Sequence, residues 1–126
     1  LAACRLGKPI NILRMSIGER YDGFKLCIKR ETAYNVNYIY FDNFKPGDRV
    51  LIVDDVISSG STIRCILDQL ISMGVQVAGI QAILAKDRHY RKLEADYGFP
   101  VRCLVNVDTT LPVHRGTVPD FCKGDE

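Results

Sequence analysis

The sequence has little of several features that would indicate particular classes of protein. No apolar run approaches the roughly 20 residues of a membrane-spanning helix, and no basic segment precedes a hydrophobic one as in a secretory signal. The 17 Lys and Arg residues almost balance the 15 Asp and Glu residues, for a net charge of +2. Bulk charge therefore favours neither a nucleic acid nor a membrane as partner, and we expect neither.

The cysteines also lack a pattern. There are five of them, an odd number, and no two form a C-x-x-C pair, so they fit neither a disulfide framework nor a zinc site. Cys65 and Cys103 lie in apolar stretches, where a free cysteine acts as a small hydrophobic side chain. We interpret the cysteines as reduced thiols, which favours a cytoplasmic protein.

What is present is an ordinary globular composition, 47% hydrophobic and 25% charged over 126 residues. This size allows one compact domain with its own core. In the first part of the chain, apolar and β-branched runs predict short strands, and the residues KPGD at 45–48 predict a turn. The predicted strands are residues 9–13, 24–28 and 37–41.

The second part alternates between strand and helix patterns. Residues 50–53 form a continuous apolar run, which is typical of a strand in the middle of a parallel sheet covered by helices. From Thr62 the apolar positions follow a helical period that ends at Gly74. A strand at 75–84, a helix at 90–97 and a strand at 101–107 are predicted next. This order predicts an α/β fold with a central, mostly parallel sheet flanked by helices.

The segment VLIVDDVISSGST, residues 50–62, carries the most chemical information. Its strand ends in Asp54 and Asp55, and open α/β sheets bind ligands at the carboxyl ends of their strands. The small, hydroxyl-rich loop that follows exposes backbone N–H groups at the start of a helix, which suits a phosphate dianion. Because a phosphate would repel the two acids, we interpret them as acceptors for sugar hydroxyls or as ligands of a divalent cation. The residues thus predict a phosphorylated sugar with Mg²⁺.

Other known loops fit this segment less well. It lacks the Lys of a Walker A loop, and Gly60 stands alone where a dinucleotide loop has three glycines. A phospho-receiver domain is disfavoured because the strand at 75–84 is followed by Ala85 and Lys86 rather than by an acid. The acids and serines could simply cap the helix, but a single cap residue would be enough for that.

The same segment closely resembles the phosphoribosyl pyrophosphate (PRPP) motif of type I phosphoribosyltransferases. It departs from the commoner form in Ser59, where Thr is usual, and in Ser61, where a second Gly is usual. Residues 45–49 resemble the purine members, and weaker similarity extends over about residues 6–107. The resemblance implies the Rossmann-like type I fold. It also implies transfer of phosphoribose from PRPP to a purine base, with release of pyrophosphate and formation of a nucleoside monophosphate.

The resemblance implies a role for each residue of the motif. Asp54 and Asp55 would bind the ribose hydroxyls, directly or through water and Mg²⁺, and would favour the positive ribose of an oxocarbenium-like transition state. Arg14 stands where the family places a basic residue for the pyrophosphate, although the next residue is Met15 and not the Lys of many adenine-type members. The residues expected to hold the 5′-phosphate are Ser58, Ser59, Gly60, Ser61 and Thr62.

The resemblance also implies roles for residues outside the motif. A mobile loop that closes over the site and excludes water would carry Lys25, Lys29, Arg30 and Tyr34. Lys86 resembles a Lys that hypoxanthine-guanine members use against the exocyclic oxygen of a 6-oxopurine, since an ammonium group donates to a carbonyl. Residues 86–88 fit a solvated turn at the end of a strand at least as well, so the identity of the base stays open.

Residues 1–110 are expected to form the phosphoribosyltransferase domain, and residues 111–126 a C-terminal extension on its surface. Residues 1–6 resemble the end of a helix, and the family's usual opening strand is not found, so we expect the domain to be N-terminally incomplete. The resemblance further implies a homodimer. The alternative function is a PRPP-sensing regulator with the same fold and no transferase activity. A PRPP synthetase is disfavoured because its usual plan has two domains.

Overall fold

The computed structural model describes residues 1–110, so the expected extension at 111–126 lies outside the described residues. No helix within residues 1–110 is long and apolar enough to cross a membrane. The elements are, in order, α1 (Ala2–Arg5), β1 (Arg14–Ile17), β2 (Cys27–Glu31), β3 (Val36–Tyr40), β4 (Arg49–Ile57), α2 (Ser61–Ser72), β5 (Gln76–Lys86), α3 (His89–Tyr97) and β6 (Val101–Val107).

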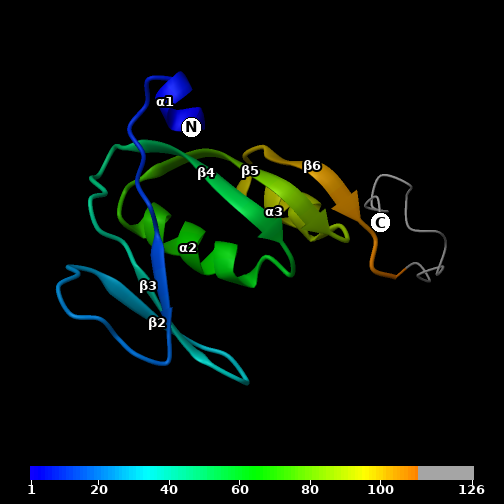
Figure 1. Ribbon diagram of the computed structural model, residues 1–126. Helices are drawn as coiled ribbons and strands as arrows, with labels where there is room; N and C mark the ends of the chain where they lie inside the picture. Colours follow the sequence, from blue (N-terminus) through cyan, green and yellow to red (C-terminus); the bar gives the residue numbers. More distant parts are fainter. Residues whose placement is uncertain (111–126) are drawn as a thin grey trace, which may run out of the picture.

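The strands form two sheets of three strands each (Figure 1). In the parallel sheet β5 lies between β4 and β6, and α2 and α3 make the two crossovers. In the antiparallel sheet β3 lies between β1 and β2. The predicted α/β fold, with a parallel sheet flanked by helices, is therefore confirmed.

Helix α2 packs against both sheets. Its residues Ile63 and Leu67 belong to one core cluster with residues of β4, β5, α3 and β6. Leu70, one turn further along, belongs to a second cluster with Ile39 and Phe41, at the end of β3. Figure 1 shows the helix with β4 on one side and the β2–β3 hairpin on the other. The helix is thus held from two directions, and its first turn lies at the carboxyl end of the parallel strands.

Strand β4 differs from the expectation in its position. Among the described residues it is an edge strand, paired with β5 alone, so its predicted place in the middle of the sheet is wrong. Its apolar residues alternate in burial, because Ile52 contacts both core clusters whereas Leu51 and Val53 are exposed on the opposite face. An apolar run alone does not distinguish an edge strand from a central strand, since every residue in it is hydrophobic in either position.

The first two predicted strands are displaced. No strand forms at residues 9–13, and β1 begins at Arg14, because the register that pairs Arg14 with Tyr40 would bring residues 9–13 beyond the end of β3. There the chain turns at Asn43, which has a positive φ of 67°. Strand β2 begins at Cys27, three residues later than predicted, and continues to Glu31. The prediction of β3 is confirmed to within one residue at each end.

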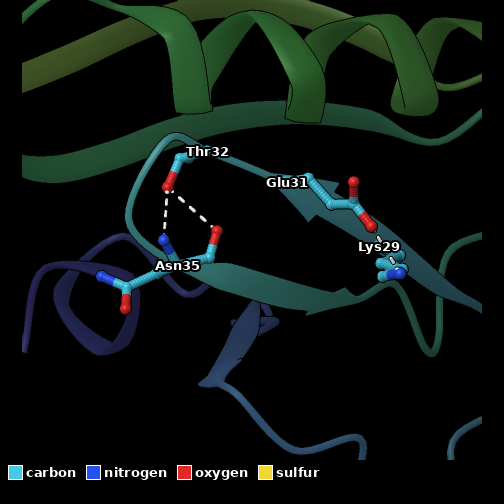
Figure 2. A network of polar contacts seen from close by, with 4 residues as sticks. All are labelled: Lys29, Glu31, Thr32 and Asn35. Atoms are coloured by element: carbon cyan, nitrogen blue, oxygen red, sulfur yellow. Dashed lines mark hydrogen bonds and ion pairs between the residues drawn. The ribbon is translucent and has the colours of Figure 1, made fainter.

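The turn that joins β2 to β3 explains the displacement of β2. Figure 2 shows the Thr32 side chain against the backbone of Asn35. The Thr32 hydroxyl donates to the Asn35 carbonyl (2.9 Å) and accepts from the Asn35 N–H (3.0 Å). This turn pairs Glu31 with Val36 and so sets the register of the whole hairpin. Because of this register, strand β2 includes the polar residues Lys29, Arg30 and Glu31.

Removing the side chain that α2 buries most deeply should destabilise the fold. Leu67 is fully buried, so Leu67→Ala is expected to lower the free energy of unfolding by about 2–5 kcal/mol through lost burial and a residual cavity. Ile71→Ala, on the same helix but half-exposed, should cost about 1 kcal/mol or less. Urea unfolding of both variants measures the difference, and equal losses would contradict the packing described for α2.

Candidate functional site

The loop of residues 58–60 joins the carboxyl end of β4 to the first turn of α2. Gly60 is the N-cap residue, with a φ of 78°, and its carbonyl accepts the Arg64 N–H at 2.9 Å. The first N–H groups of a helix have no helical partner and lie at the positive end of its dipole. Gly60 has no side chain to accept from them, so this turn suits an anionic ligand.

The end of β4, the loop and the first turn of α2 enclose a pocket of about 100 Å³. All five residues predicted to hold the phosphate line it, together with Asp54. The lining residues are Asp54, Val56, Ile57, Ser58, Ser59, Gly60, Ser61, Thr62 and Ile63. The structure therefore brings one carboxylate and the hydroxyl-rich loop to the same pocket, which matches a ligand with both a phosphate and sugar hydroxyls.

The two predicted acids do not line this pocket together. Asp54 is half-buried and belongs to the lining, whereas Asp55 is exposed and does not, because consecutive strand residues point to opposite faces. The Asp55 N–H donates to Oδ1 of Asp54 (2.9 Å), and the Val56 N–H donates to Oδ1 of Asp55 (2.8 Å). Within residues 1–110, no three His, Cys, Asp or Glu side chains gather as a metal site, so these residues alone form no metal cage.

Burial raises the pKa of the Asp54 carboxyl above its ordinary value of 3.8. The hydrogen bond from the Asp55 backbone opposes this rise in pKa, while the neighbouring Asp55 carboxylate adds to it. The charged form of Asp54 is therefore less favourable in the folded protein than in water. A ligand hydroxyl or a cation beside this carboxylate would offset that cost.

The hydroxyl groups of the loop are linked to the antiparallel sheet. Arg30, on β2, donates from Nη2 to the Ser61 hydroxyl and from Nη1 to the Thr62 hydroxyl, each at 2.7 Å. Ser61 in turn lies 3.1 Å from the Ser59 hydroxyl. The resemblance assigned Arg30 to a mobile loop, and the sequence contained no signal for its contact with residues 31 and 32 positions further along the chain.

Arg14 and Tyr34, also predicted for the site, lie elsewhere in this structure. Arg14 lines a different pocket, of about 300 Å³, with Phe24, Tyr40 and Asp42 among its other lining residues. Tyr34 is 92% exposed in the hairpin turn.

The predicted lysines are exposed and line neither pocket. The Lys25 backbone N–H donates to the Asp42 carboxylate. Lys29 pairs with Glu31 at 2.5 Å, which raises the pKa of the Lys29 ammonium and lowers that of the Glu31 carboxyl. Lys86 is the last residue of β5 and follows Ala85, which pairs with Ile57. It therefore lies at the carboxyl end of the parallel strands, as the loop does.

A polar cluster that the sequence did not predict fixes the turn after Lys86. Asp87 has a positive φ of 54°, and its carboxylate accepts from the Thr109 N–H (2.7 Å) and hydroxyl (2.8 Å). These hydrogen bonds lower the pKa of the Asp87 carboxyl. Asn106 also donates to the Asp87 carbonyl. An Asp at the end of a strand is typical of a turn, but its partner lies 22 residues away and leaves no local signal.

A family model and the curated relatives of this chain point to the same family. A family model described as "Phosphoribosyl transferase domain" matches residues 43–111, which include the loop and the pocket. Hypoxanthine/guanine phosphoribosyltransferase of Aciduliprofundum boonei is 28% identical over 105 residues, covering 82% of this chain and 55% of that protein. The HGPRTase-like protein of Halobacterium salinarum is 38% identical over 84 residues, covering 67% of this chain and 44% of that protein. The chain thus spans about half the length of these curated relatives.

The fold has solved counterparts as well. The crystal structure of adenine phosphoribosyltransferase from Thermoanaerobacter pseudethanolicus superposes with a TM-score of 0.63 at 23% sequence identity. The match covers 83% of this chain and 60% of that one. At this level of identity the likeness shows a shared fold.

The raised pKa of Asp54 predicts a stability that depends on pH. The folded protein holds the Asp54 proton more tightly than the unfolded chain, so the associated stability is complete below pH 3.8 and is lost as the pH rises through the raised pKa. Asp54→Asn removes that loss and should be more stable than the parent protein at pH 7, by a margin that narrows on acidification. Urea unfolding across this range measures the margin. A margin that widened toward low pH would contradict the assigned direction.

The left-handed conformation of Gly60 predicts a second effect. A side chain at this φ costs about 1–2 kcal/mol, and a Cβ would also lie 3.2 Å from Cδ1 of Leu93 on α3. Gly60→Ala should therefore lower the free energy of unfolding more than Gly18→Ala, where φ is 80° but the space is open. Thermal or urea unfolding compares the two variants. Equal losses would show that the contact with Leu93 has no influence.

Proposed function

The chain belongs to the phosphoribosyl transferase domain family, and on that premise we propose that the protein transfers 5-phosphoribose from PRPP to a purine base. Pyrophosphate leaves and a nucleoside monophosphate forms. The observation that carries the proposal is the pocket that Asp54 lines together with residues 58–62, which are the loop and the first two residues of α2. Its two kinds of polar group, a carboxylate and a phosphate loop, correspond to the two ends of a phosphorylated ribose.

The 5′-phosphate is assigned to the first turn of α2. The first N–H groups of the helix, which have no helical partner, and the helix dipole favour a dianion there, and Ser59, Ser61 and Thr62 line the same pocket. Such a site binds the phosphate with groups already in place, so little conformational entropy is lost on binding.

Asp54 is assigned to the ribose hydroxyls, which donate to carboxylates. Loss of pyrophosphate leaves positive charge on the ribose ring, and a nearby carboxylate stabilises that charge more in the transition state than in the substrate. Mg²⁺ is proposed to arrive with PRPP, because Mg²⁺ is commonly held by one or two carboxylates together with substrate phosphates. Asp54 and Asp55 suit that mode, Asp55 through the ion or a water molecule. When bound, the ion would neutralise charge on the leaving pyrophosphate.

A 6-oxopurine is the base that Lys86 would suit. Its ammonium group can donate to an exocyclic carbonyl but not accept from the amino group of adenine. Lys86 lies at the carboxyl end of the parallel strands, as the loop does, and the curated relatives named above include a hypoxanthine/guanine enzyme. Both observations support hypoxanthine or guanine over adenine.

An assay of pyrophosphate release tests the proposal. The protein is incubated with PRPP, Mg²⁺ and, one at a time, adenine, hypoxanthine, guanine, xanthine and orotate. We expect release with hypoxanthine or guanine and none with orotate. Retained PRPP binding without release in the presence of any base would contradict the transferase and favour a PRPP-sensing regulator.

Asp55→Asn should weaken PRPP binding while leaving the fold intact. Asp55 is proposed to act on the ligand through Mg²⁺ or a water molecule, and a hydrogen bond to a charged group contributes about 1.5–3 kcal/mol, so the dissociation constant for Mg-PRPP is expected to rise about tenfold or more. Isothermal titration measures the change. Asp68→Asn is the matched control, because it removes an exposed carboxylate that accepts the Tyr97 hydroxyl and does not line the pocket. Unchanged affinity in Asp55→Asn would count against the assignment of the site.

A further inference from the structure

Arg30 brings a positive charge to the phosphate loop from the other sheet. It lies on β2 and is half-buried against the first turn of α2. Its two terminal nitrogens donate separately to the hydroxyls of Ser61 and Thr62, both at 2.7 Å. A guanidinium group is a planar fork, so two short hydrogen bonds fix its orientation against the loop.

The other charges of β2 lie away from the loop. Side chains of a strand alternate between faces, so Lys29 and Glu31 share one face and Arg30 points to the other. Figure 2 shows Lys29 and Glu31 against each other, and the 2.5 Å ion pair between them uses the strand's only carboxylate. Within residues 1–110 Arg30 makes no ion pair with a carboxylate. Its charge therefore faces the loop without a counterion, which suits an anionic ligand.

The hydrogen bonds of Arg30 also decide what the two hydroxyls can do. A hydroxyl has one hydrogen to donate and two lone pairs to accept with, and a guanidinium can only donate. Because Arg30 occupies a lone pair on each oxygen, the hydrogens of Ser61 and Thr62 are free to donate. Within residues 1–110 the Thr62 hydroxyl has no acceptor for its hydrogen, and the Ser61 hydroxyl has only that of Ser59, at 3.1 Å. A charged phosphate oxygen is an acceptor for the Thr62 hydrogen and a stronger acceptor than the Ser59 hydroxyl for the Ser61 hydrogen.

We propose that Arg30 is a positioning residue for the 5′-phosphate of PRPP, acting through Ser61 and Thr62. It holds the two hydroxyl oxygens so that their hydrogens are available to the phosphate, and its charge favours the dianion. The inference rests on the proposed function, which supplies the phosphate. It differs from the role that the resemblance implied, in which a mobile loop closes over the site and excludes water. The positioning role predicts that binding of the 5′-phosphate, and not of the whole substrate, depends on Arg30.

Binding of the two halves of the substrate separates these roles. Isothermal titration measures the affinity of the protein for ribose 5-phosphate and, separately, for pyrophosphate with Mg²⁺. Arg30→Ala should weaken ribose 5-phosphate binding about tenfold or more and change pyrophosphate binding less than twofold. Arg30→Lys keeps the charge but loses the fork, so it should recover part of the lost affinity. Arg91→Ala is the matched control, since Arg91 is an exposed arginine on α3 whose side chain contacts Tyr90.

A double-mutant cycle tests whether Arg30 acts through Thr62. If it does, Arg30→Ala combined with Thr62→Val should weaken ribose 5-phosphate binding little more than the stronger of the two single substitutions. Independent losses that add would overturn the positioning role. A loss confined to pyrophosphate, or equal for both ligands, would overturn the assignment to the 5′-phosphate. Circular dichroism of each variant confirms that it is folded, and Arg30→Lys keeps the test decisive should Arg30→Ala fail to fold.

The two proposals fail in different ways. If the unsubstituted protein binds no ribose 5-phosphate, the proposed function is contradicted, and the role of Arg30 with it. If the unsubstituted protein binds ribose 5-phosphate and Arg30→Ala binds it equally well, only the role of Arg30 is contradicted.

Discussion

Helix α2 is packed between two sheets, and the position of every polar group in the candidate site follows from that packing. Ile63 and Leu67 hold the helix against the parallel sheet, and Leu70 holds it against the end of β3. A helix buried on both sides cannot slide or rotate without opening one of its two interfaces, because protein interiors are close-packed. Its first turn is consequently fixed at the carboxyl ends of the parallel strands, where the loop and Asp54 meet.

The same packing explains why polar groups of distant origin converge on one loop. Strand β2 runs beside α2, so Ile28 contacts the core while Arg30, two residues on, reaches the hydroxyls of the first turn. On the side of the parallel sheet, the buried side chain of Leu93 on α3 lies next to Gly60. The loop is therefore supported from α3 and from β2, and the binding groups do not depend on its own few residues for their geometry.

The sequence predicted those parts of the molecule that local patterns determine. The helical period from Thr62 and the loop before it are local features, and both the helix and the shared pocket of residues 58–62 are present. The bounds of β1 and β2 depend on pairing with β3, so propensity alone displaced them. Likewise Asp54 and Asp55 are adjacent in sequence, but the pleat of β4 puts only Asp54 in the pocket. The contact of Arg30 with Ser61 and Thr62 arises from tertiary packing, which no local pattern encodes.

The hairpin turn of residues 32–35 has a consequence for the electrostatics of the loop. Its hydrogen bonds between Thr32 and Asn35 set which residues of β2 face α2 (Figure 2). A slip of one residue in the pairing would reverse the two faces of the strand. Lys29 and Glu31 would then be presented toward α2 as a neutral pair, and the guanidinium would point into solvent. A single inserted or deleted residue in this small turn would thus remove the net charge that meets the phosphate loop, without altering any residue of the loop itself.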